Sequence, residues 1–251
     1  MASSKSSARS TVAQSPNSLT QKMSAHELAA FLCEDLASEA ATIIAAWITQ
    51  SKRFQSFAAH HRTKIRKKFR TAKTLEGLQS VLLELEVACQ LLTDRRCEVE
   101  YERYGQGGVR GPDLTLVFRE NTVVNVEVTL LQDTGTEKNQ RDDKLINLVG
   151  HKLGQMISEN CNVLVLACEC GSLSVEDVGG AMKRLKGRVE QRDSRLLSKF
   201  GFADPSEFFK QFQWLSAVIV WQSLGEEERL WANPQARRPI PTVVAALLTR
   251  S

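Results

Sequence analysis

Two acidic side chains in an apolar hairpin are the residues of this sequence best suited to chemistry. Residues 110–132 contain two apolar segments around a polar turn, a pattern that predicts a β-hairpin. Asp113 opens the first strand, and Glu127 lies in the second strand on the face opposite to Val124, Val126 and Val128. A buried carboxylate is costly unless it is paired or binds a metal ion. The pair therefore indicates a site for a hard cation, or else a turn aspartate and a Glu127 that is neutralised by a Lys or Arg.

The length of the turn decides whether the two carboxylates can meet, because cross-strand partners share a face of the sheet. A two-residue turn pairs Leu114 with Glu127 and leaves Asp113 on the wrong face. A three-residue turn over 120–122 pairs Thr115 with Glu127 and brings Asp113 to the same face. A shared site therefore requires a loop of odd length or a β-bulge.

The order Pro112-Asp113, thirteen intervening residues and Glu127-Val128-Thr129 resembles the core motif of the PD-(D/E)XK nuclease superfamily. That motif is Pro-Asp, a short hairpin, an acid, one residue and a Lys. The resemblance covers residues 78–170 and implies an α/β fold. It implies a restriction-endonuclease-like three-layer core, with a central mixed sheet flanked by helices, and Mg²⁺-dependent hydrolysis of phosphodiester bonds. Thr129 stands where the family has its Lys, so another residue must supply the amine.

Predicted helices before and after the hairpin each carry a charge on their apolar side. Glu84 falls within the apolar arc of the helix over 74–92, and Lys152 falls within that of the helix over 137–160, with Gln155 at its edge. The resemblance implies that the first helix offers an acid to the metal site and that the catalytic Lys can move to the second helix. The alternatives are a Glu84 paired with an Arg and a Lys152 that extends its ammonium to solvent.

The expected site contains Glu84, Asp113, Glu127, Lys152 and Gln155. The three acids supply only oxygen ligands, which suit Mg²⁺ or Mn²⁺ rather than zinc. Such an ion would activate a water molecule and neutralise charge on the phosphate. The ammonium would orient that water or stabilise the developing negative charge, and the amide could position it.

Positive charge is concentrated in one predicted helical stretch over 48–71. The whole chain has a formal net charge of only +4, yet residues 52–73 hold nine Lys and Arg residues and no acid. Such a face could contact a phosphate backbone without reading sequence, or it could be solvated or paired with acids elsewhere. The predicted nucleic-acid-binding residues are Arg62, Lys64, Arg66, Lys67, Lys68 and Arg70.

Composition divides the chain of 251 residues into three parts. Residues 1–23, rich in Ser and Thr and without acids, predict a disordered tail, with an organellar transit peptide as the alternative. Residues 24–73 predict a helical extension that is basic at its C-terminal end, and residues 74–251 the nuclease-like α/β domain. The six scattered cysteines favour reduced thiols and a cytoplasmic location, and no apolar run predicts a membrane span.

Two functions follow from these patterns. The first is a Mg²⁺-dependent nuclease that acts on DNA. The second is a nuclease-like fold that has lost catalysis and binds nucleic acid or a protein partner, which Thr129 favours. A nucleotide-binding small-molecule enzyme is disfavoured because the glycines at 105–111 lack GxGxxG spacing. The sequence does not fix the oligomeric state, and a homodimer is compatible with it.

Overall fold

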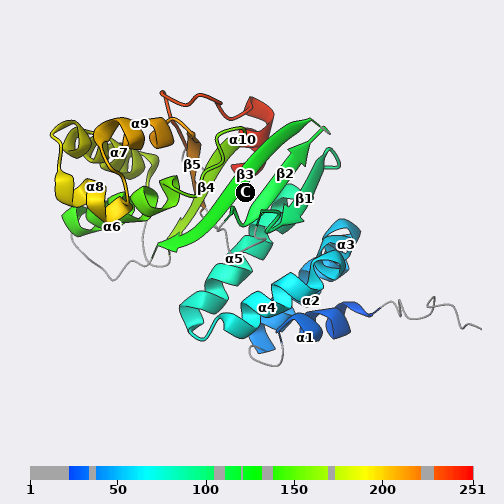
Figure 1. Cartoon of the computed structure of the whole chain (residues 1–251). Coiled ribbons are helices and arrows are strands. Elements are labelled where there is room, and N and C mark those ends of the chain that lie inside the picture. Colours follow the sequence, from blue (N-terminus) through cyan, green and yellow to red (C-terminus); the bar gives the residue numbers. More distant parts are fainter. Residues whose placement is uncertain are drawn as a thin grey trace, which may run out of the picture.

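The computed structural model describes residues 23–33, 38–104, 111–119, 121–131, 138–168, 173–221 and 229–250. Apart from Met23, the predicted N-terminal tail lies outside these residues. The chain is an α/β protein (Figure 1). Its described strands form one mixed sheet in the order β1-β2-β3-β4-β5-β6. The strands are β1 (Cys97–Tyr101), β2 (Leu114–Phe118), β3 (Thr122–Leu131), β4 (Cys161–Cys168), β5 (Leu215–Trp221) and β6 (Leu230–Ala232).

The strands β2 and β3 form the expected antiparallel hairpin, with a different register from the one proposed. Phe118 pairs with Thr122, so the connecting loop has three residues, at 119–121 rather than 120–122. Thr115 therefore pairs with Asn125 and not with Glu127. Leu114 pairs with Val126, so the next position in the same register sets Asp113 opposite Glu127. The requirement for an odd loop is met, and the proposed Thr115–Glu127 pairing is wrong.

The central strands are parallel, because a helix connects β3 to β4 and further helices connect β4 to β5. β4 is buried along nearly its whole length, as its uninterrupted apolar sequence predicts. The edge strands β1 and β6 pair antiparallel with their neighbours.

Helices cover both faces of the sheet and create two apolar clusters. The first cluster joins one sheet face to α1 (Ala25–Cys33), α2 (Ser38–Gln50), α3 (Lys52–His60), α4 (Arg62–Thr71), α5 (Leu75–Leu91) and α10 (Thr242–Leu248). The second joins the other face to α6 (Lys138–Leu153), α7 (Val175–Glu190), α8 (Ser194–Phe200) and α9 (Pro205–Phe212). Figure 1 shows α6 to α9 together on one side of the molecule and α1 to α5 on the other. Val124, Val126 and Val128 face the first cluster, so Glu127 faces the second.

Local sequence signals explain several helix ends. Ser24 and Glu27 exchange the two bonds of a capping box at the start of α1, at 3.2 Å and 2.7 Å. Ser174 and Asp177 form another at the start of α7. Gly201 ends α8 with φ of 80°, a left-handed conformation that favours glycine.

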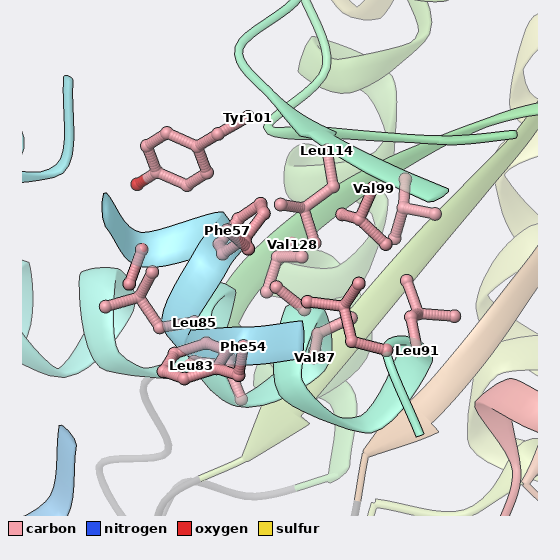
Figure 2. Packing of buried hydrophobic residues seen from close by; sticks show 14 of the residues in the cluster. Phe54, Phe57, Leu83, Leu85, Val87, Leu91, Val99, Tyr101, Leu114 and Val128 are labelled. Atoms are coloured by element: carbon pink, nitrogen blue, oxygen red, sulfur yellow. The ribbon is translucent and has the colours of Figure 1, made fainter. Parts of the chain in front are cut away.

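The N-terminal helices share their core with the sheet. Figure 2 shows side chains of α3 and α5 gathered with those of β1, β2 and β3 in the first cluster. Arg53 also binds carbonyl groups just after α5, with Nη1 2.6 Å from Leu92 O and 2.5 Å from Asp94 O. The segment expected as an extension is thus attached to the α/β core by apolar packing and by a half-buried cation.

Two expected helices are shorter in the structure. The stretch over 48–71 breaks twice, at Ser51, which caps α3, and at His61. The His61 ring lies 4.9 Å from the Phe57 ring and 6.3 Å from the Tyr101 ring. The break at His61 turns this imidazole toward the core. The helix over 137–160 ends at Leu153, because Asn162 binds both the N–H and the C=O of Ile157 and holds the following turn against β4.

Candidate active site

Asp113 lies at the start of β2, where it connects the hairpin to the N-terminal helices. One carboxylate oxygen, Oδ2, accepts a hydrogen bond of 3.0 Å from the backbone N–H of Val128 on β3. The other, Oδ1, lies 2.8 Å from the Lys68 ammonium on α4. The side chain is 15% exposed, so this carboxylate is held on both oxygens in a partly buried position.

Glu84 reaches the same ammonium from α5. Its oxygens lie 2.7 Å and 2.8 Å from Lys68 Nζ, and the Tyr101 hydroxyl donates a further hydrogen bond to Oε2. Burial, followed by the nearby Asp113 charge, raises the pKa of Glu84 to about 8, although Lys68 and Tyr101 favour its ionised form. The predicted buried acid on this helix is therefore present and partnered by a Lys rather than by an Arg.

Lys68 joins these two carboxylates, and Glu102 Oε1 lies 3.5 Å from the same nitrogen. Burial alone would lower the pKa of Lys68, but the charges of Asp113 and Glu84 outweigh it and raise that pKa above its usual value. Sequence reasoning placed Lys68 among the phosphate-contacting cations and not at the acids. One signal was available: Lys68 follows the buried Ile65 by three residues, at the edge of the buried face of the helix.

Glu127 and Lys152 form the second half of the site. The Lys152 ammonium on α6 contacts Glu127 Oε1, with the two side chains 25% and 12% exposed. Burial, followed by the Asp113 charge, raises the pKa of Glu127 to about 7, and Lys152 opposes this rise. Asp113 thus interacts with both glutamates, and each glutamate has its own lysine. Thr129 lies two residues further along the same face as Glu127.

A small hollow of about 10 Å³, room for about one water molecule, adjoins this second pair. Gln155 lines it together with Glu127, Lys152 and Pro112. Because α6 ends at Leu153, Gln155 stands in the turn after the helix, where its backbone N–H binds Lys152 O at 3.0 Å.

A row of buried polar side chains crosses the sheet beside Glu127, and sequence reasoning missed it. Asn125 Nδ2 donates to Asn162 Oδ1 at 3.2 Å, Thr115 Oγ1 lies 3.4 Å from Asn125 Oδ1, and Ser216 Oγ accepts from Asn162 N at 3.0 Å. Asn162 Nδ2 also donates to the carbonyl of Trp214. These bonds satisfy the buried amides and fix β2 to β5 at the level of the site.

The three acids do not form a ready-made metal cage. Within the described residues, no group of three or more His, Cys, Asp or Glu side chains is arranged to hold a metal ion. The expected three-acid ligand set is instead divided into the Glu84–Lys68–Asp113 cluster and the Glu127–Lys152 pair. Two carboxylates still suit Mg²⁺, which binds through one or two carboxylates, waters and substrate phosphates.

The remaining predicted phosphate contacts differ in their availability. Lys64 Nζ donates to the carbonyls of Tyr101 and Glu102 at 2.9 Å and 3.0 Å, and the Arg66 guanidinium lies 4.3 Å from the centroid of the Phe31 ring. The other three side chains of this group, Arg62, Lys67 and Arg70, are exposed on α4.

Comparisons of this chain with protein-family models, with curated proteins and with solved structures find no match. The resemblance to the nuclease motif therefore depends on the residues themselves. Among the described residues, no helix is both long enough and apolar enough to cross a membrane.

Proposed function

We propose that the protein is a divalent-metal-dependent nuclease that hydrolyses phosphodiester bonds, with DNA as the first substrate to test. The observation that carries the proposal is the convergence of Glu84 and Asp113, from α5 and β2, on one cation. Burying two acids together costs free energy unless a positive charge compensates them. An arrangement of this kind suits a site that exchanges an internal ammonium for a metal ion.

In this proposal Asp113 and Glu84 hold Mg²⁺ or Mn²⁺. Such an ion supplies Lewis acidity and lowers the pKa of a bound water. Asp113 is well placed for this role because its Oδ2 is fixed by the backbone of β3, which orients Oδ1 away from the strand. The Pro112-Asp113 and Glu127 spacing of the nuclease motif supports the same assignment.

The Glu127–Lys152 pair acts on the nucleophile and the phosphate. Glu127 accepts the proton of the attacking water as the water oxygen bonds to phosphorus. The P–O bond to the leaving sugar oxygen breaks, and solvent water protonates that oxygen. Contact with the Lys152 ammonium orients the Glu127 carboxylate. The Lys152 positive charge stabilises the negative charge that develops on the phosphate oxygens. Gln155, on the wall of the adjoining hollow, positions the water. Lys152 thereby fills the role of the family Lys that Thr129 cannot perform.

The exposed cations of α4 provide the substrate contacts. Arg62, Lys67 and Arg70 are exposed on the helix whose Lys68 reaches the two acids. A phosphate backbone bound along this helix passes close to the acids, and binding of this type weakens with salt and does not read base sequence.

Cleavage of a supercoiled plasmid tests this function. With Mg²⁺ or Mn²⁺ the wild-type protein should nick or linearise the plasmid, and EDTA should stop it. Asp113→Asn keeps the side-chain shape and should lower the rate by a factor on the order of 10² or more. Glu98→Gln, an exposed position on β1, is the matched control and should leave the rate unchanged. Equal cleavage by wild type and Asp113→Asn would remove the proposed site.

A second candidate function is nucleic-acid binding without cleavage, favoured by Thr129 and by the neutralisation of Glu84 and Asp113 by Lys68. It predicts no cleavage at any metal concentration, together with a salt-dependent gel shift of DNA. The triple variant Arg62→Ala/Lys67→Ala/Arg70→Ala should weaken that shift.

A further inference from the structure

A second cavity, of about 380 Å³, lies between α7, the end of α9 and β6. Its volume falls within the range of small-molecule sites. None of its lining residues belongs to the candidate active site. Its lining has an aromatic wall, an edge with two lysines and one exposed carboxylate, Glu190, and a wall of bare helix backbone. Each of these features restricts the ligand.

The bare wall is formed by two glycines of α7, eight residues apart. A Cβ atom at Gly187 would meet no atom within 4 Å, whereas one at Gly179 would lie 3.5 Å from Trp231 Cδ1. Glycine is unfavourable in the middle of a helix by about 1 kcal/mol relative to alanine. The glycines leave room along α7 that side chains would otherwise fill.

The aromatic wall is the half-buried indole of Trp231 on β6. Its ring centroid lies 6.4 Å from that of the buried Phe212, at an interplanar angle of 63°. Trp231 is thus supported from behind by the core. An aromatic ring held in this way offers a surface on which a flat ligand can stack.

The cationic edge consists of Lys183 and Lys186, one helical turn apart on α7. Lys186 is half-buried, with its Nζ 6.0 Å from the Phe212 ring centroid. Neither lysine forms an ion pair with any described carboxylate. A half-buried ammonium beside a cavity favours a ligand that brings a negative charge.

We propose that this cavity binds a nucleotide, with its base against Trp231 and its phosphate between Lys183 and Lys186. Base stacking on aromatic side chains and phosphate binding by lysine are the two recurrent contacts of such ligands. An apolar ligand would leave the lysines unused, and a small inorganic anion would leave the indole unused. The nucleotide is either free or one unit of a single strand, since both present the same base and phosphate.

Isothermal titration in EDTA tests the proposal, with AMP, adenosine, inorganic phosphate and an oligoadenylate single strand as the probes. AMP or the oligonucleotide should bind the wild type more tightly than either fragment does. Gly187→Leu fills the cavity and raises helix propensity, so it should fold and weaken this binding by at least about tenfold. Gly180→Leu is the matched control, because a Cβ there also meets no atom within 4 Å and Gly180 does not line the cavity.

The outcomes separate this site from the proposed nuclease site. AMP binding identifies a free nucleotide as a ligand, and binding of the oligonucleotide alone identifies a strand. If Gly187→Leu loses the binding of AMP or of the oligonucleotide and Asp113→Asn keeps it, the proposal is supported, whether or not the protein cleaves DNA. Equal affinity for phosphate and AMP, unchanged affinity in Gly187→Leu, or no binding of either nucleotide probe up to about 10 mM would overturn it.

Discussion

Replacing Lys68 by methionine tests the central cluster most directly. The change keeps much of the side-chain volume and removes the charge that joins Glu84 and Asp113. The two carboxylates, 7% and 15% exposed, would then be buried without a cation. Removing one partner of a buried ion pair costs roughly 3–5 kcal/mol, and since Lys68 itself is 22% exposed, we expect about 3 kcal/mol. For a chain of this length that corresponds to a fall in Tm of about 6–12 °C.

The loss of stability should depend on pH in a defined direction. The pKa of Glu84 is about 8 in the folded protein, above its value of 4.5 when unperturbed. The folded state therefore binds this proton more tightly, and the resulting stability is complete below pH 4.5 and is lost as the pH rises through 8. Without Lys68 the folded pKa of Glu84 rises further. The difference between Lys68→Met and wild type should thus be small at pH 5 and should grow as the pH rises through 8 and above.

Added metal should reverse part of the loss, because an ion and the Lys68 ammonium compete for the same oxygens. With a Kd of about 1 mM, about 10 mM Mg²⁺ would stabilise the variant by about 1.4 kcal/mol, and wild type by less. Thermal unfolding at pH 5 and 8, with and without Mg²⁺, measures all of these quantities. Lys67→Met, exposed on the same helix, is the control. A Tm equal to that of wild type, or a deficit that does not change with pH, would refute the role assigned to Lys68.

Three further outcomes follow from buried and half-buried groups. Burial, with His60 and Lys64 nearby, lowers the pKa of His61 to about 4, so the stability it contributes above pH 6.5 should be lost as the pH falls through 4. In His61→Phe the Tm should therefore fall less than in wild type as the pH is lowered from 6.5 to 4. Arg53→Ala leaves the carbonyls after α5 without their donor and should lower the free energy of unfolding in urea by roughly 3 kcal/mol. Asn162→Leu should cost a similar amount, about 3 kcal/mol by the same measurement, because it leaves polar groups without partners on β3, in the turn after α6 and just before β5.

The sequence predicted the hairpin and the charges around it well, because those signals are local. Strand alternation placed Glu127 opposite to the Val face of β3, and the helical pattern placed Lys152 on the buried side of α6, where it contacts Glu127. The odd loop length was derived as a condition for the site. Its position was one residue off, since the choice between 119–121 and 120–122 depends on packing along both strands.

The parts that were missed depend on contacts between distant segments. Lys68 was grouped with exposed cations because α4 has no acid of its own, while its partners come from α5 and β2. The polar row through Asn125 and Asn162 requires knowledge of which strands are neighbours and of the register shift between β4 and β5. Neither strand order nor register is encoded in the periodicity of a single segment.

The segment predicted as a helical extension packs directly against the segment predicted as the α/β domain. Phe54, Phe57, Ile65 and Phe69 are buried in the same cluster as α5 and the hairpin, so the helices before residue 74 complete one face of the sheet. Lys68 comes from this part of the chain, whereas Glu84 and Asp113 come from the other. The charge balance of the two acids thus depends on how α4 packs against α5. If the protein cleaves DNA, the same helix contributes the cation between the acids and the exposed cations that meet the phosphates.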